Sequence, residues 1–161
     1  MTLRYMAILV ALFWGGSAVA QTNINLSGLT VDTDAAIEVT ADSLSVDQSS
    51  GRAVFEGNVL IGQGDLRLAA AKVEVIYGVT ANQIDRLIAT GGVTFVTADE
   101  AAEAEAADYT IDTGLLVLTG DVLLTQGVSA ISAETMAINV VDGTATMDGR
   151  VRTVLQQGDD Q

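Results

Sequence analysis

The amino-acid sequence predicts an all-β domain, with a sandwich, a barrel or an open roll as the architectures to choose from. From Ile37 onward, the segments between turns are rich in Val, Ile, Leu, Thr and Phe, which favour strands. Turn signals such as Ser50-Gly51, Gly91-Gly92 and Asp142-Gly143 recur about every 8–12 residues, a spacing typical of all-β domains. The chain has 16 Gly and no Pro, so Gly, Asn and Asp must build the turns. No long stretch shows helical periodicity.

The first twenty residues have the parts of a secretory signal peptide. Arg4 supplies a positive start, residues 6–14 (MAILVALFW) form an apolar run, and Ala18-Val19-Ala20 provides a cleavage site before Gln21. The apolar run of nine residues is too short to span a bilayer, although residues 3–20 inserted at a tilt would form an uncleaved anchor. Cleavage would place the mature chain outside the cytoplasm, and we expect residues 21–31 to be a flexible segment.

The strands that follow contain an internal repeat. Residues 51–64 (GRAVFEGNVLIGQG) match residues 114–127 (GLLVLTGDVLLTQG) at an offset of 63, and shorter copies occur at residues 89–95 and 143–151. Each copy contains the motif Gly-x-Val, and the glycine of this motif recurs after 34, 29 and 29 residues. Each unit therefore has room for roughly two or three short strands.

The repeat places a glycine in the middle of an alternating strand. Phe55, Gly57, Val59 and Ile61 share one face, because side chains alternate along a strand. A glycine in mid-strand on an apolar face indicates a bend or a bulge. Four such bends in register would curve the sheet on itself.

Residues 97–108 (TADEAAEAEAAD) depart from this pattern, because their Ala and Glu content favours a helix. We expect an exposed turn here, followed by a strand from about Ala104. The alternative is a calcium site, whose oxygen ligands would be Asp99, Glu100, Glu103 and Glu105. The stretch lacks the EF-hand and RTX spacings, so we expect no metal. The polar residues 156–161 are expected to form a disordered tail.

The composition of this chain, whose length fits one domain, argues against most chemistries. Seven Lys and Arg against 21 Asp and Glu give a net charge of −14, so the clustered cations that bind nucleic acid are lacking. The absence of Cys and His removes thiol nucleophiles, disulfides, Cys/His zinc sites and His general bases. Lys72 is the only Lys and no G-x-S-x-G motif occurs, so nothing completes a catalytic triad. We expect neither an enzyme nor a cofactor, and a glycosidase built on two carboxylates is the enzymatic alternative.

Three stretches carry a resemblance to a known family. They are residues 37–47 (IEVTADSLSVD), 53–64 (AVFEGNVLIGQG) and 66–73 (LRLAAAKV), which contain the specific string F-x-G-N-V-x-I-x-Q-G. On these residues the chain resembles the OstA-like (LptA) family, whose best-known member is a periplasmic bridge for lipopolysaccharide transport. The likeness covers about residues 32–155, nearly all of the chain that follows the leader.

The resemblance implies a single antiparallel β-jelly roll, slightly open along one side, over residues 32–155. It implies that lipopolysaccharide acyl chains lie in an apolar interior and that no catalysis takes place. It also implies that jelly rolls of an inner-membrane partner, of this protein and of an outer-membrane translocon stack end to end across the periplasm. Edge strands near residues 37–44 and 146–155 would pair between subunits, which makes an open-ended head-to-tail assembly.

The groove implied by this family likeness would be lined by inward-facing apolar residues. The candidates are Ile37, Val39, Phe55, Val59, Ile61, Leu66, Leu68, Val93, Phe95, Tyr109, Ile111, Leu116, Leu118, Val122, Leu124 and Ile138. Further candidates are Val73, Val75, Ile131, Met136 and Val151. For any single residue an ordinary core position is the simpler interpretation, and we place lipid contact first at Ile37, Val39 and Phe95.

Charge and processing leave other functions open. After cleavage, six cations against 21 acids leave −15, which would repel lipid phosphates. Recognition should therefore rest on acyl chains, with head groups left in solvent or bridged by divalent cations. A retained leader would instead make the chain an inner-membrane-anchored partner of the same complex. A dry, fully packed interior would favour a structural β-repeat protein without lipid cargo.

Overall fold

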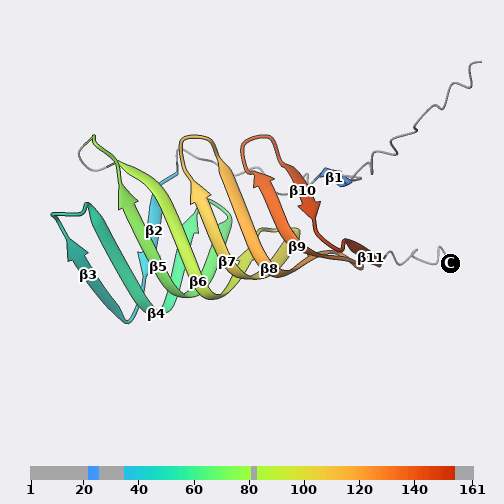
Figure 1. The fold of residues 1–161 in the computed structure, drawn as a ribbon, viewed down its shortest axis with the longest axis horizontal. Coiled ribbons are helices and arrows are strands. Elements are labelled where there is room, and N and C mark those ends of the chain that lie inside the picture. Colours follow the sequence, from blue (N-terminus) through green and yellow to red (C-terminus); the bar gives the residue numbers. More distant parts are fainter. Residues whose placement is uncertain (1–21, 26–34, 81–82, 155–161) are drawn as a thin grey trace, which may run out of the picture.

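The computed structural model describes residues 22–25, 35–80 and 83–154, which form eleven strands (Figure 1). These ranges contain no helix that is long and apolar enough to cross a membrane. The strands are β1 (Thr22–Asn25), β2 (Ile37–Thr40), β3 (Ser43–Asp47), β4 (Arg52–Gln63), β5 (Leu66–Tyr77), β6 (Ile84–Val96), β7 (Glu100–Thr110), β8 (Leu115–Gln126), β9 (Ser129–Asn139), β10 (Thr144–Asp148) and β11 (Arg152–Val154). The expected leader at 1–20 and tail at 156–161 lie outside the described residues.

All eleven strands belong to one antiparallel sheet, so the all-β prediction is confirmed. The strand order is β1-β10-β9-β8-β7-β6-β5-β4-β2, with β3 also paired to β4 and β11 also paired to β9. The sheet is therefore a meander whose two edges do not pair with each other. Four residues of the segment 21–31, which we expected to be flexible, form β1 against β10. β1 thus lies at the edge opposite to β2 and β3.

Each long strand bends near its middle, as the repeated glycines predict. The pairing register shifts at one level in every neighbouring strand pair from β4 to β9. Gly57, Gly91, Gly120 and Gly149 lie at this level with φ between 81° and 85°. Such positive φ angles are comfortable only for glycine. Gly57, Gly91 and Gly120 bend their strands without ending them, so the strands reach 13 residues and are longer than the short strands we expected.

The bend glycines do not lie on the apolar face, which corrects the expected placement of Gly57. A Cβ atom added to Gly57, Gly120 or Gly149 would come closer than 3.0 Å to an acidic side chain of the neighbouring strand or loop. Those acids are Asp42, Glu105 and Glu134, and all three are exposed. The bulge therefore turns the bare side of each glycine toward the outer surface, where the neighbouring chain approaches closely.

The row of bends divides the sheet into two half-sheets (Figure 1). Each long strand contributes to both; β4, for example, gives residues 59–63 to the first half-sheet and residues 52–56 to the second. β2 and β11 belong to the first half-sheet, and β1, β3 and β10 belong to the second. In the described ranges no strand pair joins the two half-sheets at their rims, away from the bends.

The interior between the half-sheets is filled by apolar side chains. Val59, Val73, Leu118 and Met136 are fully buried and follow or precede the bends by one or two residues. Burying a side chain of this size contributes roughly 1.5–3 kcal/mol. The hydrophobic core therefore runs along the inside of the bend row and holds the two half-sheets together there.

The Ala/Glu segment bends at residues 98–99 and is a strand from Glu100 onward, so the strand begins four residues before the predicted start at Ala104. β7 begins at Glu100, whose side chain is buried. Thr97 Oγ1 and Gln126 Nε2 donate hydrogen bonds to the Glu100 carboxylate over 3.0 and 2.9 Å. Pairing with β6 and β8 on both sides outweighs the helix preference of these residues.

The expected edge strands are each divided in two. The strand predicted at 37–44 is β2 followed by β3, because the chain bends at Asp42, which covers Gly57. The strand predicted at 146–155 is β10 followed by β11, because Gly149 bends the chain. Val151 lies in that break and is 37% exposed, and its place in the apolar lining stays a prediction.

Candidate functional site

A narrow apolar cleft lies between the two half-sheets toward their rims. The first half-sheet lines it with Ile37, Ile61, Gln63, Leu66, Leu68 and Phe95. The second half-sheet and the turn after β9 line it with Leu87, Ala89, Ala107, Tyr109, Leu116 and Val140. Its volume is about 20 Å³, which is room for little more than one water molecule. The half-sheets are thus nearly in contact along the cleft.

Two of the lining side chains are polar. Gln63 is 2% exposed, and its Nε2 atom donates a hydrogen bond of 3.3 Å to the carbonyl of Ala35. Tyr109 is 7% exposed, and its hydroxyl has no hydrogen-bond partner in the described part of the chain. Burial raises the pKa of Tyr109 above its ordinary value, because the phenolate would be poorly solvated there. The phenol therefore keeps its proton at neutral pH.

Seven of the residues predicted from the sequence line this cleft together. They are Ile37, Ile61, Leu66, Leu68, Phe95, Tyr109 and Leu116. The other five lining residues were not predicted from the sequence; they are Gln63, Leu87, Ala89, Ala107 and Val140. Leu87 and Ala89 alternate with outward-facing residues of β6, which is a signal that could have found them. Gln63 is polar, so an apolar alternation does not indicate it.

The other predicted residues lie elsewhere. Those at most 2% exposed, in the core and outside the cleft lining, are Val59, Val73, Val75, Val93, Leu118, Val122, Leu124, Met136 and Ile138. Ile111 and Ile131 are half-buried against this core. Val39 and Phe55 are half-buried and, with Leu44, line a surface hollow of about 440 Å³. Whether any of these residues contacts lipid stays a prediction.

The apolar interior reaches the surface at the end formed by β2 and β3, which we call the open end. Leu44 and Val46 of β3 pair with Phe55 and Ala53 of β4, so they face the interior. They are nevertheless 55% and 58% exposed, because no strand of the described residues lies beyond β3. At the opposite end of the sheet, β1 pairs with the edge of β10 that faces away from β9, and we call this the covered end.

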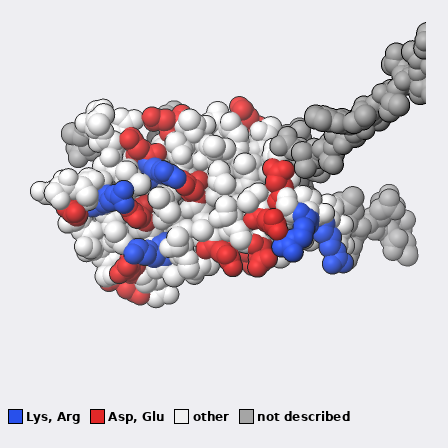
Figure 2. Space-filling model, viewed as in Figure 1, with Lys and Arg blue, Asp and Glu red and all other residues white. Residues whose placement is uncertain are grey.

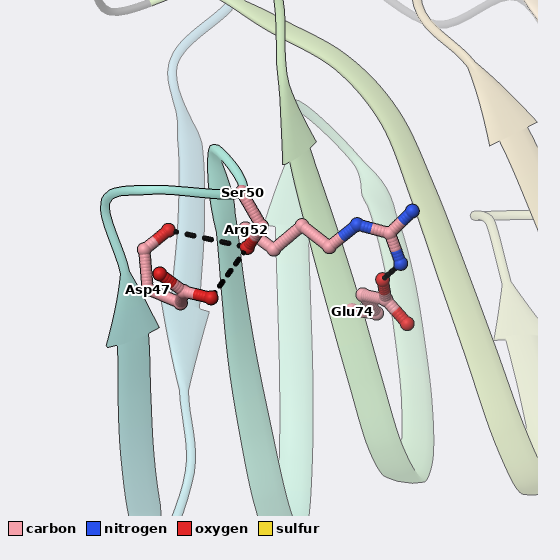
Figure 3. A network of polar contacts seen from close by, with 4 residues as sticks. All are labelled: Asp47, Ser50, Arg52 and Glu74. Carbon is pink, nitrogen blue, oxygen red and sulfur yellow. Dashed lines mark hydrogen bonds and ion pairs between the residues drawn. The ribbon is translucent and has the colours of Figure 1, made fainter.

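Polar contacts at the open end hold the turn between β3 and β4 (Figure 3). The hydroxyls of Ser49 and Ser50 donate to the carboxylate of Asp47 over 2.6 and 2.9 Å. These hydrogen bonds lower the pKa of Asp47 to about 2. Next to the turn, Arg52 of β4 forms an ion pair with Glu74 of β5.

The outer surface offers little to bind phosphate. Figure 2 shows acidic side chains spread over the visible face, with cations placed beside acids. Four ion pairs account for Arg52, Lys72, Arg86 and Arg150, whose partners are Glu74, Glu56, Asp108 and Glu134. Within the described ranges no three acids gather as a metal site would require, and Glu105 of the considered calcium site lies beside Gly120 instead.

Comparison with known proteins gives the family. A sequence model described as "LptA/(LptD N-terminal domain) LPS transport protein" matches residues 38–144, from β2 to the start of β10. The chain belongs to this family. An uncharacterized protein of Rhizobium meliloti (strain 1021) is 28% identical over 151 residues, which cover 86% of this chain and 81% of that protein.

A solved structure has the same fold. It is the crystal structure of LptH, the LptA-homologous periplasmic component of the lipopolysaccharide transport device from Pseudomonas aeruginosa. The TM-score is 0.72 at 19% identity, with 79% of this chain and 99% of LptH covered. The predicted open jelly roll and the predicted family are both confirmed. Membership in a family of transport proteins also confirms that the chain is not an enzyme.

Proposed function

We propose that the protein is a periplasmic carrier that holds lipopolysaccharide by its acyl chains between the two half-sheets. The observation that carries this proposal is an apolar interior that forms a cleft toward the rims and comes to the surface at the open end, in a chain that belongs to a lipopolysaccharide-transport family. Each buried methylene of an acyl chain contributes about 0.8 kcal/mol, so a few chains supply ample affinity without head-group contacts.

Lipid entry requires the half-sheets to separate, because a cleft of about 20 Å³ is too small for an acyl chain. The described rims share no strand pairing, so separation breaks no ladder of backbone hydrogen bonds. The half-sheets would turn about the bend row, where the fully buried residues Val59, Leu118 and Met136 lie. The cost of opening is the apolar contact across the cleft, which the acyl chains replace.

The proposed partners are a second copy of this chain, an inner-membrane component and an outer-membrane translocon that present the same fold. The open end supports this, because β3 leaves its backbone and the side chains of Leu44 and Val46 uncovered. A strand from a neighbouring jelly roll would extend the sheet and continue the apolar interior. The contact joins two unlike ends, so it is head-to-tail and does not close.

The periplasmic location rests on two supports. Residues 1–20 have the pattern of a cleaved leader, and the structurally similar LptH is a periplasmic component. Mass spectrometry of the protein exported with its own leader tests this location. A mass beginning at Gln21 supports the periplasmic carrier, whereas a mass retaining Met1 would favour the membrane-anchored partner of the same complex.

Site-specific photocrosslinking tests the lipid site. A benzophenone side chain replaces Ile37 or Leu66 in the cleft, and Leu60 or Leu123 on the outer face serves as the matched control. With purified lipopolysaccharide as the probe, we expect adducts from the two cleft positions only. Adducts from none of the four positions, or from all four equally, would contradict the carrier.

A second candidate is a structural β-repeat protein that carries no lipid. The small volume of the cleft and the complete burial of Phe95, at 1% exposed, favour it. The two candidates differ in the crosslinking experiment, because a structural protein would yield no lipid adduct at Ile37 or Leu66 while keeping its fold.

A further inference from the structure

Tyr109 places a hydroxyl in the apolar cleft, and the described part of the chain gives it no hydrogen-bond partner. The residue lies on β7 between Leu87 of β6 and Leu116 of β8, so its side chain stands over the middle of the second half-sheet. Buried tyrosine hydroxyls usually have a partner, because an unsatisfied polar group costs free energy. The described part of the fold thus holds a buried hydrogen-bonding group without a partner.

The surroundings of this hydroxyl restrict what can satisfy it. The only other polar side chain lining the described cleft is Gln63, whose amide donates to the carbonyl of Ala35. The remaining lining residues are apolar, which suits a hydrocarbon chain and not a sugar or a phosphate. Because burial raises the pKa of Tyr109, the phenol is protonated at neutral pH and acts as a donor.

We propose that Tyr109 donates a hydrogen bond to an oxygen atom carried on an otherwise apolar acyl chain, either a chain hydroxyl or an ester carbonyl. The inference rests on the proposed function, because an acyl chain must enter the cleft before it meets this group. An unsubstituted chain would leave the hydroxyl unsatisfied, whereas an oxygen-bearing chain satisfies it. The cleft therefore selects among acyl chains and prefers oxygen-substituted ones.

Two fatty acids of equal length test this selection. The full exported chain is titrated with tetradecanoate and with 3-hydroxytetradecanoate, and Kd is measured for each. We expect the wild-type protein to bind the hydroxylated acid about 3- to 10-fold more tightly, the gain of one neutral hydrogen bond. Tyr109→Phe should bind both acids equally and should unfold at the same or a higher temperature, because it removes an unsatisfied group.

Tyr77→Phe is the matched control, because Tyr77 also belongs to a strand of the second half-sheet but is 40% exposed and does not line the cleft. It should keep the wild-type preference. Equal binding of both acids by the wild-type protein, or an unchanged preference in Tyr109→Phe, would overturn the inference and leave the carrier standing. Binding of neither acid, together with an absence of lipopolysaccharide adducts at Ile37 and Leu66, would overturn both.

Purified lipopolysaccharide as a third probe identifies the source of the oxygen. If Tyr109→Phe weakens lipopolysaccharide binding by the factor lost for 3-hydroxytetradecanoate, the oxygen belongs to the acyl chains of lipopolysaccharide. If the fatty-acid preference disappears while lipopolysaccharide affinity is unchanged, the subsite binds free hydroxylated acyl chains instead.

Discussion

The two ends of the roll bury their inward-facing residues to very different degrees. At the open end, Leu44 and Val46 face the interior and remain more than half exposed. At the covered end, Ala145 and Met147 of β10 are 3% and 0% exposed, and β1 pairs with the edge of β10 that faces away from β9. The apolar interior therefore continues to the surface at the open end and stops at the covered end.

This difference in burial comes from the neighbouring strands and not from residue type. Both ends contain alternating apolar residues, yet among the described strands β10 has a neighbour beyond it and β3 has none. An uncovered inner face at a sheet edge is a site where another strand adds. The open and covered ends differ in structure, as the proposed head-to-tail stack requires.

The largest difference between the ends should appear in the free energy of unfolding. Met147→Ala at the covered end removes a fully buried side chain and leaves a cavity, so it should cost about 2–5 kcal/mol. Leu44→Ala at the open end should cost less than about 1 kcal/mol in the monomer, because Leu44 is 55% exposed. Urea denaturation of both variants measures this, and equal costs would mean that the open end is covered in solution.

The bend row that runs through both ends should show the next largest effect. Gly120→Ala forces an L residue to a φ of 82° and brings its Cβ against Glu105, so we expect a loss of about 2–3 kcal/mol. Gly127→Ala is the control, because its φ is 57° but open space surrounds it, and strain alone should cost about 1–2 kcal/mol. Urea denaturation separates the two; a Gly120→Ala loss no larger than that of the control would mean that Glu105 moves away freely.

The sheet, the bends and part of the cleft are predictable from the sequence because each has a local signal. Strand residues alternate, and a glycine in mid-strand marks a bulge, so the row at Gly57, Gly91 and Gly120 was predictable. The Ala/Glu segment was not, because its pairing with β6 and β8 is a tertiary effect that local preference cannot reveal.

The cleft was only partly predictable for a related reason. Alternation shows which residues face inward but not which of them meet the opposite half-sheet near a rim. Leu118 and Tyr109 therefore carried the same signal, yet Leu118 lies in the core and Tyr109 lines the cleft. The pairing of β1 with β10 joins segments more than a hundred residues apart, and nothing local in residues 21–31 indicates it.

A charge on the inner face of β3 should weaken association between copies of the chain. Val46→Lys places a cation at the edge where we expect the next strand to add, and such charges oppose strand addition. We expect the dissociation constant for self-association to rise about tenfold, as measured by sedimentation of the full chain. Val79→Lys, in the fully exposed turn after β5, is the control and should leave the constant unchanged. An unchanged dissociation constant for Val46→Lys would mean that copies of the chain do not associate through β3.

The smallest effect concerns pH at the open end, where Asp47 holds the turn before β4. Its pKa is lower in the folded chain, about 2, than in the unfolded chain, where it is near 3.9. The ionised carboxylate therefore stabilises the turn fully above about pH 4, and this contribution is lost as the pH falls through about 2. NMR titration should show the amides of Ser49 and Ser50 shifting in this window while those of β10 stay unchanged. Asp47→Asn, which cannot titrate, should abolish the shift. If the pKa of Asp47 is near its ordinary value, the hydrogen bonds from Ser49 and Ser50 do not stabilise the carboxylate. Asp47 then does not hold the turn at the open end.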